Sequence, residues 1–226
     1  MRFISRTFCL LMLLLGVSST LSANSIPITL NNAGSNVMGG VYVGAYNFTL
    51  TIGSKHLPAK LICDDFNSEV YIGEKWRVKT STFPSLSNVK WPNQKINYAK
   101  VGWLVLQMNS PANRNNAITV GNIQWAIWDI FAPGVSNHNP YGQLSLLDKT
   151  NVNHWLTLAQ TNYATGNYSS LVIYTPIRNS QPSYYGTPQE YFGEGTPNTP
   201  TPEPNTLLLF GTGIAALARW RRQIFS

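Results

Sequence analysis

Cys63 raises the first chemical question in this sequence. The chain has two cysteines, and Cys9 lies in the apolar run of residues 8–17, which small residues follow. This order is typical of a secretory signal peptide, and we expect cleavage near Ala23. Cys63 is then the only cysteine of the exported chain, so it cannot form an internal disulfide. An unpaired thiol in an oxidising compartment is buried as a small hydrophobe, paired with another chain, or chemically engaged.

Gln124 is the second residue that ordinary packing does not explain. Residues 122–131 predict a helix that ends before Pro133. On that helix Gln124 shares one face with Ile127 and Trp128. A primary amide buried among apolar side chains costs on the order of a few kcal/mol when it has no partner. We therefore expect Gln124 to be hydrogen-bonded, exposed at an edge, or consumed in a covalent bond.

Both residues lie in short, distinctive motifs. Residues 62–66 read ICDDF, and residues 123–128 read IQWAIW. The pair resembles the motifs of thioester domains, which occur in bacterial surface proteins. The resemblance extends over roughly residues 40–180. It implies that Cys63, at the end of a strand, and Gln124, on a helix, are joined by an internal thioester.

The chemistry of such a bond is coherent. When folding holds the two groups together, the Cys63 thiolate attacks the amide carbon of Gln124 and expels ammonia. The product survives only where water is kept away, and Trp125 and Trp128 are candidates for its apolar cover. Its acyl group can then pass to an amine or hydroxyl of a partner. That predicts a single covalent attachment and no enzymatic turnover.

Asp64 and Asp65 follow the cysteine directly and complete the expected surroundings of the bond. Either carboxylate is a candidate acceptor for the thiol proton. Nearby carboxylates also raise the pKa of a thiol, however, and so oppose thiolate formation. The alternative is that the two residues cap a turn or pair with Lys60 or Lys75.

The C-terminus carries a second, three-part pattern. It consists of a tripeptide, a short apolar run and a basic cluster: Pro202, Glu203 and Pro204; residues 206–218; and Arg219, Arg221 and Arg222. As a helix the apolar run reaches only about 20 Å, against about 30 Å for the hydrocarbon core of a bilayer, so it spans only with help from its flanks. Because basic residues are retained on the cytoplasmic side, both ends face inward and the chain between them is exported.

This pattern resembles the PEP-CTERM sorting signal of Gram-negative bacteria. The resemblance implies an inner-membrane anchor that an exosortase cleaves near residues 202–204, followed by transfer to the cell surface or the extracellular matrix. The alternative is a plain C-terminal anchor that is never processed. In either reading the protein is membrane-anchored and exported.

The charge pattern argues against a nucleic-acid partner. The formal net charge is +7, from 16 Lys and Arg against 9 Asp and Glu. Five of the basic residues lie at the two ends, which leaves 11 basic against 9 acidic residues between residues 24 and 204. No basic stripe remains for phosphates to follow. Charged residues make up only 11% of the chain, which excludes a charge-rich disordered protein or a coiled coil.

The elements that must position these residues are strands early and late in the chain, with helices between them. β-branched and aromatic runs predict strands, and three- and four-residue spacing predicts helices. The strands are expected at residues 28–30, 41–52, 57–63, 76–82 and 170–176, and the helices at residues 94–109, 122–131 and 145–163. The first helix is expected to bury Ile96, Ala99, Trp103 and Leu106, and Leu104 and Met108 widen this apolar stripe. The predicted fold class is α+β, an antiparallel β sandwich or barrel with an inserted helical subdomain.

Four segments follow from this organisation. The signal peptide covers residues 1–23, and an exported thioester-like domain covers residues 24–180. Residues 181–201 are rich in Pro, Gly and Thr, which predicts an extended linker. Residues 202–226 form the sorting segment with a short C-terminal transmembrane run.

Two other functions stay open on the sequence. One is a noncovalent structural or polysaccharide-binding protein with a free buried Cys63, whose sugar surface would use Trp76 and Trp91, the tryptophans least expected in the core. The other is a secreted hydrolase, although no nucleophile elbow, P-loop or dinucleotide fingerprint is present. The three histidines lack metal-ligand spacing, so no metal or cofactor is expected.

Overall fold

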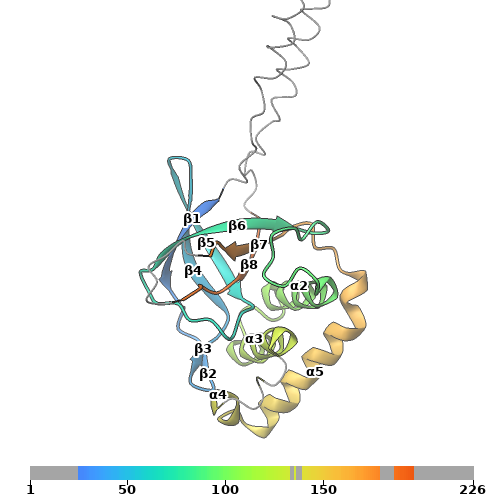
Figure 1. The fold of residues 1–226 in the computed structure, drawn as a ribbon. Coiled ribbons are helices and arrows are strands. Elements are labelled where there is room, and N and C mark those ends of the chain that lie inside the picture. The colour runs from blue at the N-terminus through green and yellow to red at the C-terminus, as the bar shows by residue number, and fades with distance from the viewer. Residues whose placement is uncertain (1–24, 133–134, 136–138, 179–185, 196–226) are drawn as a thin grey trace, which may run out of the picture. The chain divides into compact units, whose positions relative to one another are not determined.

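The computed structural model describes residues 25–132, 135, 139–178 and 186–195, which form a group of strands beside a group of helices (Figure 1). The strands are β1 (Ile26–Asn32), β2 (Val37–Met38), β3 (Val41–Tyr42), β4 (Ala45–Ile52), β5 (Lys55–Cys63), β6 (Lys75–Thr82), β7 (Leu171–Pro176) and β8 (Tyr191–Glu194). The helices are α2 (Lys95–Asn109), α3 (Ala117–Phe131), α4 (Asn139–Gly142) and α5 (Leu146–Asn162), with a 3-10 turn η2 (Tyr163–Thr165).

Six of the strands close into a barrel in the order β1, β4, β5, β8, β7, β6. The expected α+β class is confirmed, with a barrel and not a sandwich. Strand β4 alternates in the way a barrel wall requires, because Tyr46, Phe48 and Leu50 are buried while their neighbours are not. Gly53, with a φ of 59°, makes the tight turn into β5, a backbone conformation that favours glycine.

Aromatic side chains fill the barrel interior. The ring of Phe48 lies edge-on to Trp76 at 5.8 Å and to Tyr191 at 4.8 Å between centroids, a favourable arrangement of ring quadrupoles. Trp76, one of the two tryptophans least expected in the core, is only 2% exposed and therefore belongs to it. Trp91 is half-buried and stacks on Phe131 at 4.3 Å.

The helices are inserted between β6 and β7 and pack against one another (Figure 1). Helix α3 begins earlier than the expected residue 122, because the Asn116 side chain caps it by accepting a hydrogen bond from the Thr119 N–H at 3.1 Å. Helix α2 has the expected bounds but a rotated face. It buries the expected Leu104 and Met108 together with Tyr98 and Val101, whereas Ile96 is 57% exposed.

Strand β8 comes from the segment that was expected to be a linker. It pairs with β5, and this pairing sets Cys63 opposite Tyr191. Tyr191 and Phe192 are fully buried, so the assignment of the whole of residues 181–201 to a linker is wrong. The folded domain extends through Gly193. The Pro and Gly content of this segment predicts a linker, although the segment contains a short strand.

The terminal segments lie outside the described residues. These are the signal peptide, the tripeptide at residues 202–204, the apolar run, and the arginines at positions 219, 221 and 222. Within the part of the chain that the structure describes, no helix is both long and apolar enough to cross a membrane.

Candidate functional site

The structure brings Cys63 and Gln124 into contact, although they lie 61 positions apart along the chain. Cys63 ends strand β5, Gln124 lies on helix α3, and both side chains are fully buried. The Gln124 Nε2 donates a hydrogen bond of 2.7 Å to the Cys63 carbonyl oxygen. The Gln124 Oε1 has no hydrogen-bond partner among the described residues. The amide group is thus held beside the cysteine by one end only.

The Cys63 sulfur is surrounded by groups with opposing effects. The Asp65 N–H donates to Sγ at 3.4 Å, and the thiol donates to the Asp65 carbonyl oxygen at the same distance. Burial raises the pKa of the Cys63 thiol well above its ordinary value, and the carboxyls of Asp65 and Asp64 raise it further. The Asp65 N–H and the side chain of Trp128 act in the opposite direction. The resting thiol is therefore protonated at neutral pH.

Aromatic rings from α3 and the loop after β5 cover this region. Trp125 is fully buried and Trp128 is 3% exposed. Phe66 packs on both, with centroids 5.7 Å from Trp125 and 5.2 Å from Trp128. The two indoles meet edge-on at 5.1 Å. Such a cover limits access of water to the groups beneath it.

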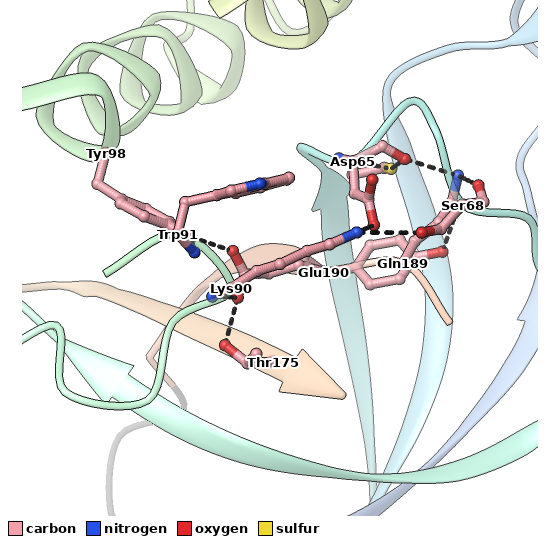
Figure 2. Close-up of polar contacts among 10 residues, drawn as sticks. Asp65, Ser68, Lys90, Trp91, Tyr98, Thr175, Gln189 and Glu190 are labelled. Carbon is pink, nitrogen blue, oxygen red and sulfur yellow. Dashed lines mark hydrogen bonds and ion pairs between the residues drawn. The ribbon is translucent and has the colours of Figure 1, made fainter. Parts of the chain in front are cut away.

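Asp65 is held by residues that the sequence did not single out (Figure 2). The Lys90 ammonium forms an ion pair with the Asp65 carboxylate and donates to Ser68 Oγ at 3.1 Å. The Gln189 Nε2 donates to the carbonyl oxygens of Asp65 at 3.1 Å and of Ser68 at 2.7 Å. Lys90, and not the expected Lys60 or Lys75, is therefore the partner of Asp65.

The side chain of Asp64 lies in a second, buried acidic part of the site. Its carboxyl lies against that of Glu190, and both residues are fully buried. Glu190 accepts hydrogen bonds from the Tyr98 hydroxyl at 2.5 Å, the Lys90 N–H at 2.8 Å and the Thr175 hydroxyl. Asp64 has no partner of good geometry among the described residues.

The surroundings of the two carboxyls also determine their pKa values. Burial, then the charges of Glu190 and Asp65, raise the pKa of Asp64 well above its ordinary range. Burial also raises the pKa of Glu190, which its hydrogen-bond donors oppose. Burial and the neighbouring carboxyls thus favour the neutral form of Asp64.

Other candidate groups do not converge on a second site. His56 and His154 are exposed, and His138 lies outside the described residues. Within the described ranges, no three His, Cys, Asp or Glu side chains are grouped as a metal site would require. The six tryptophans of the described domain are all buried or half-buried. Within the described residues, Cys63 and Gln124 are thus the buried thiol and amide that lie side by side.

Comparison with known proteins identifies the C-terminal signal. The PEP-CTERM protein-sorting motif matches residues 200–223. The motif marks an exported protein that is anchored in the membrane before an exosortase, its processing partner, acts on it. Searches of curated proteins and of solved structures gave no match. The resemblance to thioester domains therefore has no counterpart in these comparisons.

Proposed function

We propose that this exported, exosortase-sorted protein attaches covalently to amine- or hydroxyl-bearing partners through an internal Cys63–Gln124 thioester. The observation that carries the proposal is the 2.7 Å hydrogen bond from Gln124 Nε2 to the Cys63 carbonyl, made between two fully buried residues. The proposal places the mature protein at the surface or in the extracellular matrix of a Gram-negative bacterium.

The proposed reaction balances without an external reagent. The Cys63 sulfur forms a bond to the Gln124 side-chain carbonyl carbon, the C–N bond of the amide breaks, and the thiol proton leaves with the nitrogen as ammonia. A partner amine or hydroxyl later attacks the same carbon. The C–S bond then breaks, the new amide or ester remains on Gln124, and the proton of the nucleophile restores the thiol. Each molecule therefore reacts once.

The burial of the pair supports this reading. The hydrogen bond from Gln124 to the Cys63 main chain keeps the amide beside the cysteine in the folded state. Such proximity replaces a bimolecular encounter, which is worth up to about 7–11 kcal/mol of barrier once the reacting groups are well oriented. The aromatic cover of Phe66, Trp125 and Trp128 gives the bond protection from hydrolysis. The alternative of a sugar-binding surface built on tryptophans is less favoured, because the tryptophans of the described domain are buried or half-buried, although Tyr42 and Tyr71 are exposed.

Intact-protein mass spectrometry tests the proposal. The full-length protein, purified at neutral pH without reducing agent, is expected to be lighter than its sequence by one ammonia. Methylamine is expected to add once, at Gln124 by peptide mapping. Cys63→Ala should abolish both mass changes, whereas Gln143→Ala, which changes an exposed glutamine after α4, should leave them intact. A wild-type protein of full sequence mass, with Cys63 free to alkylation once unfolded, overturns the proposal.

A further inference from the structure

We propose that Lys90 and Gln189 are positioning residues that clamp Asp65 against the Cys63 sulfur, and that thioester formation depends on this clamp. The inference rests on the proposed function, because it concerns how that bond forms. The clamp comes from two distant parts of the chain. Lys90 precedes α2, and Gln189 precedes β8.

Gln189 fixes the main chain after Cys63. Its Nε2 reaches the carbonyl oxygens of both Asp65 and Ser68, and its Oε1 accepts a 2.8 Å hydrogen bond from the Tyr191 hydroxyl. Gln189 is 9% exposed and Tyr191 is fully buried. The amide therefore has a fixed orientation, and its two donor contacts hold the main chain at Asp65 and Ser68 together, as Figure 2 shows.

Lys90 fixes the side chain of Asp65. Its ammonium contacts the Asp65 carboxylate and the Ser68 hydroxyl, while its own N–H is held by Glu190. Asp65 is thus held by an ion pair from its carboxylate to Lys90 and by a hydrogen bond from Gln189 to its carbonyl oxygen. The remaining polar group of Asp65, the main-chain N–H, is the one that points at the Cys63 sulfur, at 3.4 Å.

This geometry decides the electrostatics at the sulfur. An N–H directed at sulfur favours the thiolate, and the Lys90 ammonium offsets the Asp65 carboxylate that opposes it. Without Lys90, an unpaired buried carboxylate would face the thiol. Without Gln189, the Ser68 carbonyl would lose this donor and the Asp65 carbonyl would keep only the Cys63 thiol, so the Asp65 N–H would be held less firmly on the sulfur. The clamp thus weakens the hindrance from the Asp65 carboxylate and keeps the Asp65 N–H on the sulfur.

A refolding experiment tests the clamp. The full chain, recovered unfolded in urea with Cys63 and Gln124 unreacted, is refolded by dilution into detergent at a series of pH values, and loss of ammonia is followed by intact mass. Lys90→Met is expected to slow the reaction about tenfold and to shift its pH profile upward, as a one-unit rise in thiol pKa would do. Gln189→Leu is expected to slow it similarly. Lys90→Arg should retain most of the rate.

Two further variants separate positioning from mere folding. Lys60→Met removes an exposed lysine on β5 and should react like wild type. In the Lys90→Met chain, adding Asp65→Asn removes the carboxylate that Lys90 neutralised and should restore the rate, which no loss of folding would allow. Circular dichroism and the urea midpoint verify that each variant folds.

The outcomes distinguish the two proposals. If wild type never loses ammonia, the thioester itself is refuted. If wild type loses ammonia and the folded Lys90→Met and Gln189→Leu chains do so at the same rate, the clamp is refuted and the thioester stands. A slower Lys90→Met reaction with an unshifted pH profile, or without rescue by Asp65→Asn, also refutes the clamp.

Discussion

The proposed bond would close a loop, and opening that loop should cost the domain a calculable amount of stability. Cys63 and Gln124 are 61 positions apart. A covalent link between them removes conformational freedom from the unfolded chain, by the same chain-entropy argument that applies to a disulfide. For a loop of this length the relation gives about 14 cal/mol/K, or about 4 kcal/mol at 25 °C.

The prediction is that the linear chain unfolds more easily by this amount. For a domain of this size, about 4 kcal/mol corresponds to a fall of about 8–16 °C in Tm. Two routes give the linear chain. Methylamine opens the thioester and leaves a methyl group on buried Gln124, which adds about 1–3 kcal/mol of overpacking strain. Cys63→Ser prevents the link without adding volume.

Urea unfolding followed by tryptophan fluorescence measures the difference, with the mass of each sample checked before and after. Cys63→Ser is the control, since methylamine should not change its unfolding free energy. The reasoning is refuted if mass spectrometry shows the link in wild type and the treated and untreated proteins still differ by less than about 1 kcal/mol. In that case the bond would exist without constraining the unfolded chain.

Two further predictions concern the surroundings of the bond. Phe66→Ala removes two ring contacts worth about 0.5–1.5 kcal/mol each, so methylamine should react about tenfold faster; Phe83→Ala, whose ring packs elsewhere on Tyr168, is the control. Asp64 faces Glu190 and Asp65, and its pKa is raised on folding. Its contribution to stability is therefore complete below about pH 3.9 and is lost as pH rises through its folded pKa. In urea titrations, Asp64→Asn should then become more stable relative to wild type as pH rises above about 4, by up to about 1.4 kcal/mol per pH unit, and a stability difference that does not change with pH would contradict this reasoning.

The elements of the fold could be predicted where one local pattern decided them. Helices α2 and α5 have nearly the expected bounds, because their apolar spacing and the Ser145 cap of α5 are local signals. The buried face of α2 was not predictable in the same way. Tyr98 turns inward because its hydroxyl meets Glu190 at 2.5 Å, and that partner lies far along the chain.

The residues of the site also differ in how far the local sequence could predict them. Cys63 and Gln124 could be singled out because each is unusual in its own segment: a lone thiol, and an amide on an apolar face. Lys90, Gln189 and Glu190 could not, because no spacing links them and each is ordinary locally. Their roles exist only once β8 pairs with β5, and the Pro and Gly content around β8 favours a linker.

The position of Gln189 and Glu190 late in the chain also bears on when the proposed bond forms during export. Gln189, Glu190 and Tyr191 lie in the last part of the folded domain, shortly before the sorting motif at residues 200–223. The surroundings of Cys63 are therefore complete only when β8 has joined the barrel. If the clamp assists the reaction as proposed, the bond forms only after β8 has paired with β5. A chain still being translocated would then carry an unreactive amide, and no reactive acyl group would meet nucleophiles before its aromatic cover had formed.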